Sequence, residues 1–132
     1  MNADRDFSTR PVFDLIRQLP CCQVSAMGEI DYDASDPALI QRIGDNAAQV
    51  MATMHRGTAA IGLLLANAGP EIETRSLSAD VVEALGHTLA EMGDLAAQCD
   101  LIATGCRRAT ADYLPLVFRA RVEPDDGHLP KS

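Results

Sequence analysis

Two stretches of the chain repeat apolar or small residues at alternating intervals of three and four. In the first stretch they are Ile40, Ile43, Ala47, Val50, Met54, Gly57, Ile61 and Leu64. In the second they are Val82, Leu85, Leu89, Met92, Ala96, Cys99, Ala103 and Cys106. These are the a and d intervals of a heptad, along which one helix packs on another. The pattern predicts two long helices, over about residues 37–68 and 79–113, whose contact line we call the seam.

Capping signals flank both predicted helices. Ser35 or Asp36 can cap the first, with Pro37 in its first turn, and Ser76 or Ser78 can cap the second. The linker between them, residues 71–77, is short enough to make the helices antiparallel. The sequence therefore predicts an all-α fold, a helical hairpin that occupies residues 36–113.

Shorter elements are expected on either side of the hairpin. Residues 11–19 place Val12, Phe13, Leu15, Ile16 and Leu19 on one side of two helical turns, which predicts a short helix closed by Pro20. Residues 22–27 fit a short strand, and residues 28–36 fit a loop. Together they form an N-terminal region over residues 1–35. After Pro115 the weak alternation of residues 116–122 predicts an extended segment, and residues 114–132 end in a polar tail.

Pairing the two seams leaves other apolar residues unused. They are Leu39, Met51, Leu63 and Leu65 on the first helix and Leu95, Leu101 and Ile102 on the second. Left exposed, they would form a larger patch than monomers usually carry. Homodimerisation into a four-helix bundle would bury them, and two-fold dimers are the commonest oligomers. The alternative is a monomer in which residues 1–35 and 114–122 wrap the helix pair.

Composition supports close helix packing. Aromatic residues make up 4% of the chain and Trp is absent, so the core must be built from aliphatic and small side chains. Gly57 lies on the seam, where the lack of a side chain lets two backbones approach. A bend or break of the first helix at residues 56–58 is the competing interpretation.

The formal net charge of −8 limits the partners that this chain attracts. Phosphates of nucleic acid and anionic membrane surfaces would repel it, so we expect no direct contact with either. A protein partner attracted by charge would be basic, although acidity also serves solubility alone. The N-terminal residues lack an apolar secretory segment, and the uncharged residues 57–70 are too few to span a bilayer. A cytoplasmic location with reduced thiols is the expectation.

Few residues in this sequence are typical of catalysis. His55, His87 and His128 show no metal-binding spacing with one another. Cys99 and Cys106 fall on the seam, where buried cysteine acts as a small apolar residue. Cys21 and Cys22 follow Pro20 and are the candidates for reactive thiols. We predict no catalytic, cofactor-binding or metal-binding residue.

These patterns favour a non-enzymatic, cytoplasmic protein–protein interaction module of the adaptor, chaperone or regulator type, built on a dimerising hairpin. An alternative is a small acidic inhibitor, such as a phage anti-defence protein, that blocks a basic nucleic-acid-binding groove. Ten of the eleven basic residues are Arg, and the abundance of Ala and Gly with them suggests a GC-rich bacterial or phage genome. A second alternative is a helical-bundle enzyme that uses Cys21 or Cys22.

Overall fold

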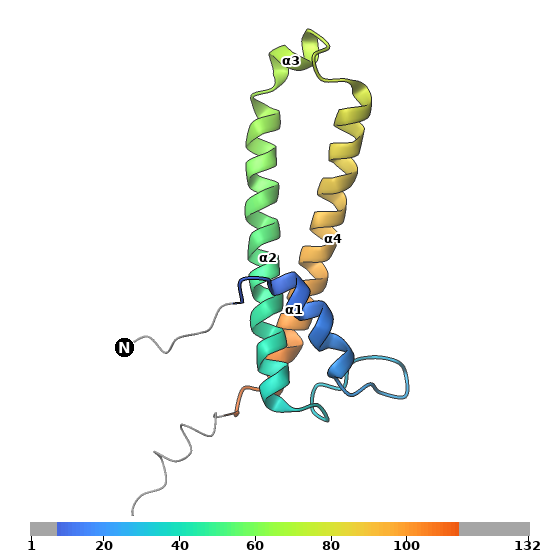
Figure 1. Cartoon of the computed structure of the whole chain (residues 1–132), viewed down its shortest axis with the longest axis vertical. Coiled ribbons are helices and arrows are strands. Elements are labelled where there is room, and N and C mark those ends of the chain that lie inside the picture. The colour runs from blue at the N-terminus through green and yellow to red at the C-terminus, as the bar shows by residue number, and fades with distance from the viewer. Residues whose placement is uncertain (1–7, 114–132) are drawn as a thin grey trace, which may run out of the picture.

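The computed structural model describes residues 8–113, and this part of the chain is mostly helical with no strand. The elements are α1 (Pro11–Gln18), a 3-10 turn η1 (Leu19–Cys21), α2 (Pro37–Ala66), α3 (Gly69–Glu73) and α4 (Ala79–Ala109). The long helices α2 and α4 run antiparallel, with α3 at the tip and α1 against the base (Figure 1). The predicted all-α fold with two long packed helices is confirmed. The extended segment predicted for residues 114–132 lies outside the described residues.

Both long helices begin at side-chain caps. The Asp36 carboxylate accepts a hydrogen bond from the backbone N–H of Ala38 at 3.2 Å, and Pro37 occupies the first turn of α2. The Ser78 hydroxyl accepts from the N–H of Val81 at 3.4 Å at the start of α4. Ser35, the other cap candidate of α2, is buried instead and links two parts of the N-terminal loop. Its hydroxyl accepts from the N–H of Gln23 at 2.9 Å and donates to the carbonyl of Asp31 at 2.7 Å.

The helices end earlier than the pattern predicts. α2 stops at Ala66 because the Asn67 side chain donates to the Leu63 carbonyl at 2.8 Å, satisfying an acceptor of the last turn. α4 stops at Ala109, where the Thr110 hydroxyl donates to the carbonyl of Cys106 at 2.8 Å. The linker is not simply a loop, since Pro70 fits the first turn of α3.

The strand predicted for residues 22–27 is wrong. An isolated antiparallel bridge between Val24 and Ile30 is the extended pairing that these residues make. Gly28 reverses the chain between them with a φ of 82°, a conformation that glycine adopts without strain. Such a two-residue pairing has no neighbouring strand to extend it, so the apolar side chains of Val24 and Met27 stay exposed.

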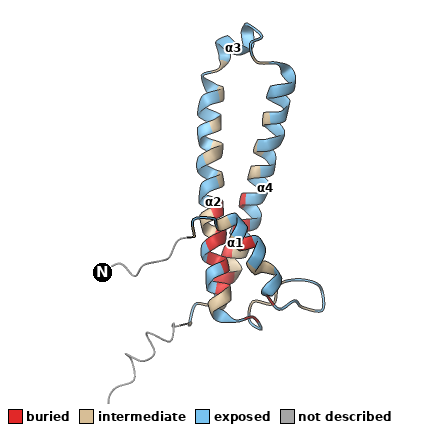
Figure 2. Cartoon of the chain, in the orientation of Figure 1, coloured by how far each residue is buried: buried red, intermediate tan, exposed pale blue. Residues whose placement is uncertain are grey.

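The core occupies only the base of the hairpin (Figure 2). It holds the first half of the α2 seam and the second half of the α4 seam, with Leu15 of α1 and Cys22 packed against them. Eight seam residues are buried, namely Ile40, Ile43, Ala47, Val50, Ala96, Cys99, Ala103 and Cys106. Toward the tip, Met54, Gly57, Ile61, Leu85, Leu89 and Met92 are half-buried, whereas Leu64 and Val82 are exposed. The seam is therefore closed at the base and open toward α3.

Two glycines away from the predicted seam set the closest packing at the base. A Cβ placed on Gly44 would lie 2.8 Å from the Cβ of Cys106, and one on Gly105 would lie 2.7 Å from the Tyr32 ring. Neither distance leaves room for a methyl group. At Gly57 the nearest atom would be the terminal methyl of Met92 at 3.0 Å, which can rotate away. α2 continues through residues 56–58, so the predicted alternative of a helix break there is excluded.

We predict that Gly44→Ala lowers the free energy of unfolding by about 1–3 kcal/mol, because the added methyl overpacks the contact with Cys106. Gly86 is the matched control: it lies within α4 with nothing within 4 Å of an added Cβ. Gly86→Ala should instead stabilise by up to about 1 kcal/mol through helix propensity. The effect of Gly57→Ala on the free energy of unfolding should lie between those of the other two variants. Urea unfolding of the three variants measures this, and equal effects at Gly44 and Gly86 would contradict the close approach.

Candidate interaction surface

The distal half of the hairpin exposes apolar residues on both long helices. We call residues 51–66 of α2 and 79–95 of α4 the distal arms. Leu63 and Leu64 of α2 are 68% and 71% exposed, and Val81 and Val82 of α4 are 51% and 39% exposed. Large aliphatic side chains held in water at these levels lose the burial energy that they would gain against a partner. The distal arms are thus the part of the described chain that resembles an unfilled interface.

An apolar groove opens at the tip between α3 and the start of α4. It has a volume of about 680 Å³ and is lined by Ile72, Arg75, Leu77, Ser78, Ala79, Val82 and Glu83. Arg75 holds the turn between the two helices with a φ of 58°, which is uncommon for a residue with a side chain. The combination of three aliphatic side chains with one charge of each sign suits an aliphatic or aromatic side chain of a protein partner.

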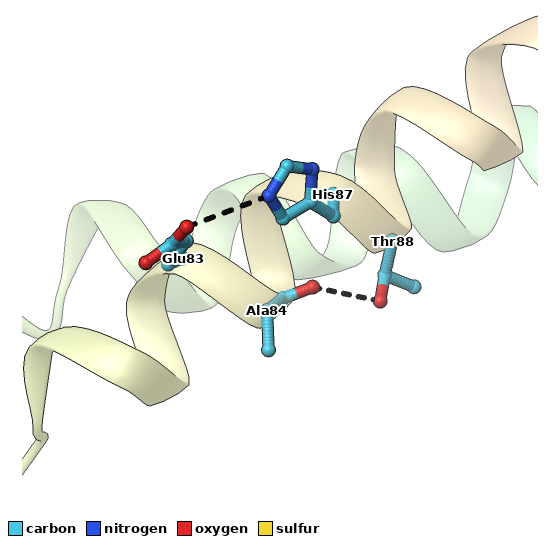
Figure 3. Close-up of polar contacts among 4 residues, drawn as sticks. All are labelled: Glu83, Ala84, His87 and Thr88. Atoms are coloured by element: carbon cyan, nitrogen blue, oxygen red, sulfur yellow. Dashed lines mark hydrogen bonds and ion pairs between the residues drawn. The ribbon is translucent and has the colours of Figure 1, made fainter.

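Acidic side chains of α4 gather along one exposed side of its distal arm. Asp80, Glu83, Glu91 and Asp94 are all exposed, and the 3.6-residue period of the helix aligns them in a single stripe that also includes His87. The His87 Nε2 atom lies 3.7 Å from a carboxylate oxygen of Glu83 (Figure 3).

The other polar contact in this part of α4 also joins two residues of the same helix. The hydroxyl of Thr88 donates to the carbonyl of Ala84 at 2.9 Å, as Figure 3 shows. His55 is exposed on α2, and His128 lies outside the described residues. Within residues 8–113, no group of three His, Cys, Asp or Glu side chains is arranged to hold a metal ion. The described polar groups of the arms are therefore dispersed along helices and do not converge on one point.

The cysteines divide into one exposed and three buried thiols. Cys21 is exposed and its thiol donates to the Arg17 carbonyl at 3.6 Å. Cys22 is buried, and loss of solvation raises its pKa, with Cys21 raising it further and a hydrogen bond with Ser35 opposing. Burial likewise raises the pKa of Cys99, and it raises that of Cys106 to about 11 with a further contribution from Cys22. The buried thiols stay protonated at neutral pH, which disfavours nucleophilic chemistry.

A polar hollow of about 350 Å³ separates α1 from α2, lined by Ser8, Thr9, Asp14, Gln18, Arg42, Asp45 and Asn46. Four of these residues bond in pairs. The half-buried Gln18 accepts from the Asn46 amide at 2.9 Å, and the Ser8 hydroxyl donates to Asp14. The Gln49 amide also donates to the Ser8 carbonyl at 3.0 Å. These bonds hold α1 on α2.

α1 contributes less to the core than its pattern predicts. Leu15 is buried and Leu19 packs against the core, but Val12, Phe13 and Ile16 are exposed. α1 covers the base at a single contact line, and a helix of two turns presents only one or two residues along such a line. The guanidinium groups of Arg10 and Arg17 lie 4.2 and 5.5 Å from the centre of the Phe13 ring and shield it in part.

The residues that lie off the seam do not divide between base and tip in this way. Leu39, Met51, Leu65 and Ile102 are half-buried, whereas Leu63, Leu95 and Leu101 are exposed.

Within the described residues, no helix is long and apolar enough to cross a membrane. No protein-family model matches the chain, and no curated protein or solved structure is similar to it.

We predict that an alkylating reagent modifies Cys21 alone in the native protein at neutral pH, because the other three thiols are buried and protonated. Mass spectrometry of the intact and digested protein measures the sites and rates, and the urea-unfolded chain is the control in which all four should react. If Cys22 reacted in the native state faster than a free model thiol, a thiol-dependent activity would regain support. If Cys21 is alkylated no faster than the model thiol, a thiol-dependent activity of Cys21 has no support.

Proposed function

We propose that this chain is a non-enzymatic protein–protein interaction module, of the adaptor, chaperone or regulator type. Its base is a folded unit that holds the two helices, and its distal arms present apolar side chains to partners. The proposal includes homodimerisation, which would cover part of the exposed apolar surface. A cytoplasmic location belongs to the same proposal.

One observation carries this function: the same apolar seam that is buried at the base stays open at the tip. Cys106 and Ile40 at the base are 1% and 0% exposed, whereas Leu64 at the other end of the α2 seam is 71% exposed. Packing of side chains at the base does not require the tip side chains to be apolar. A purely structural hairpin would carry polar residues there, since exposed leucine gains nothing in a monomer. Binding supplies the physical reason for their apolar character.

We predict that Val82→Glu abolishes capture of a protein partner from a lysate of the organism that encodes the chain. Val82 lines the tip groove, so a carboxylate there would lose its solvation against Ile72 and Leu77 when the groove is filled. Val81→Glu is the matched control, because Val81 adjoins Val82 but does not line the groove.

Proteins retained by the wild type and by Val81→Glu but lost with Val82→Glu support the proposed groove. Retention of the same proteins by all three forms would contradict it. Circular dichroism of each variant establishes that the base is folded, since neither valine belongs to the buried core.

The acidic stripe on α4 favours a second candidate function, an inhibitor that occupies a basic groove of a partner. Four carboxylates within residues 80–94 occupy one side of the helix over about 20 Å. Such a stripe steers association with a basic surface and makes that association sensitive to salt. This candidate differs from the first in the surface that it uses, which is charged and not apolar.

For the inhibitor, we predict that replacing Glu91 and Asp94 by Gln and Asn weakens binding of a captured partner at least tenfold at low salt. The affinity should also fall steeply as salt is raised for the wild type and less steeply for the variant. Replacing Asp45 and Asp100 by Asn removes the same charge from exposed positions outside the stripe and should change little. Isothermal titration calorimetry measures the affinity of the wild type and of both double variants for the partner. Equal losses in both double variants, or affinity independent of salt, would instead point to the apolar arms.

A further inference from the structure

The outward side of the distal half of α2 is apolar, exposed and uncharged. Residues 57–70 contain no charged side chain. Within them, Ala59, Ala60, Leu63 and Ala66 are exposed, and helical geometry places them away from the half-buried Ile61 and Leu65. We call these four residues the uncharged face. Small residues beside a leucine form a surface with a knob and shallow holes, on which another helix can pack closely.

The charge distribution indicates which partner suits this face. The chain has a net charge of −8, so two copies repel wherever carboxylates would face each other. On the α4 arm, Asp80, Glu83, Glu91 and Asp94 would oppose their own counterparts in a symmetric contact. The uncharged face carries no such cost. Of the two distal arms, α2 is the one on which a second copy of this acidic chain can pack without acid opposite acid.

The charged residues that border the uncharged face also indicate the relative direction of two packed copies of α2. Arg56 precedes it and Glu71 follows it, and both are exposed. Arg56 lies on α2, whereas Glu71 lies on α3 at the tip, beyond the end of α2 at Ala66. Neither forms an ion pair in the described part of the chain. When two copies of α2 pack antiparallel, the Arg56 end of each lies beside the Glu71 end of the other. Parallel packing would set Arg56 against Arg56 and Glu71 against Glu71.

We propose that two copies of this chain associate through the uncharged face of α2, antiparallel about a two-fold axis. Arg56 of each copy then lies at the Glu71 end of the other. This proposal rests on the proposed function, because it names the homodimer contact within the distal arms. The contact leaves the tip groove and the acidic stripe of α4 free in both copies.

The size of the contact sets its expected strength. Residues 57–66 span about 15 Å of helix, and one pair of helices of that length buries less than a standard protein–protein interface of about 1,600 Å². Dissociation constants in the micromolar range are therefore expected. The mass in solution should rise with concentration from one copy to two.

Charge reversal tests both the face and its direction. Arg56→Glu alone, or Glu71→Arg alone, places like charges together at both ends of the antiparallel contact, and each should weaken dimerisation by about threefold to tenfold. The double variant Arg56→Glu/Glu71→Arg restores opposite charges and should recover the wild-type dissociation constant. Sedimentation equilibrium of the full chain measures this. Additive losses in the double variant would overturn the antiparallel arrangement.

Leu63→Glu tests the face itself and should leave the protein monomeric at all concentrations measured. The matched control is Ile16→Glu on α1, since Ile16 is 64% exposed against 68% for Leu63. A wild-type chain that stays monomeric at high micromolar concentration overturns the proposal, as does a dimer that Ile16→Glu disrupts and Leu63→Glu does not. Lower thermal stability of Leu63→Glu in a monomeric wild type would show another segment of the same chain on this face, which also overturns it.

The outcome is separable from that of the proposed function. Partner capture through the tip groove depends on Val82, which is not part of the uncharged face. A dimer without a captured partner would support the α2 contact and count against the interaction module. A captured partner with a monomeric chain would support the interaction module without its homodimer and would count against the α2 contact.

Discussion

The close approach of α2 and α4 at Gly44 and Cys106 is the contact on which the rest of this structure depends. A Cβ on Gly44 would come within 2.8 Å of the Cys106 Cβ, so only glycine lets the two backbones meet there. Tyr32 packs in the same way over Gly105 and ties the N-terminal loop to the base. Side chains in so tight a contact gain much dispersion energy and tolerate little change of volume. The buried core is concentrated where this approach is closest.

The structure divides the hairpin into two parts with different physical roles. At the base, α1, α2 and α4 bury a common core and satisfy their polar groups, as the Asn46 and Gln18 amides do with each other. Toward the tip the seam residues are half-buried or exposed, although their apolar character is unchanged. Folding free energy therefore comes mainly from the base, while apolar side chains of the arms stay partly or largely exposed to solvent. That separation lets surface variants of the arms test binding without unfolding the protein.

Charge is also distributed unequally between the two arms. The distal arm of α4 carries an exposed acidic stripe, whereas that of α2 has no charged side chain after Arg56. An acidic stripe favours basic partners at a distance, because electrostatic attraction extends over about a Debye length, roughly 8–10 Å at moderate salt. An uncharged apolar face acts only at contact. The two arms thus present two physically different surfaces, one charged and one apolar.

The sequence alone determined the helices, because heptad spacing and capping residues act locally: the pattern predicted both long helices, and Asp36 and Ser78 were among the cap candidates. The sequence also showed that residues 57–70 carry no charged side chain. Only the tertiary structure decided how far the seam closes, since burial of Val50 or exposure of Leu64 depends on the distance between two helices. Packing between separate elements likewise decided the roles of Gly44 and Gly105, the tip groove lined by Ile72 and Leu77, and the exposure of Ile16. A heptad records which side of a helix is apolar, but interhelical distance is set by the bulkiest and smallest side chains that meet across the contact, and these come from segments far apart in the chain.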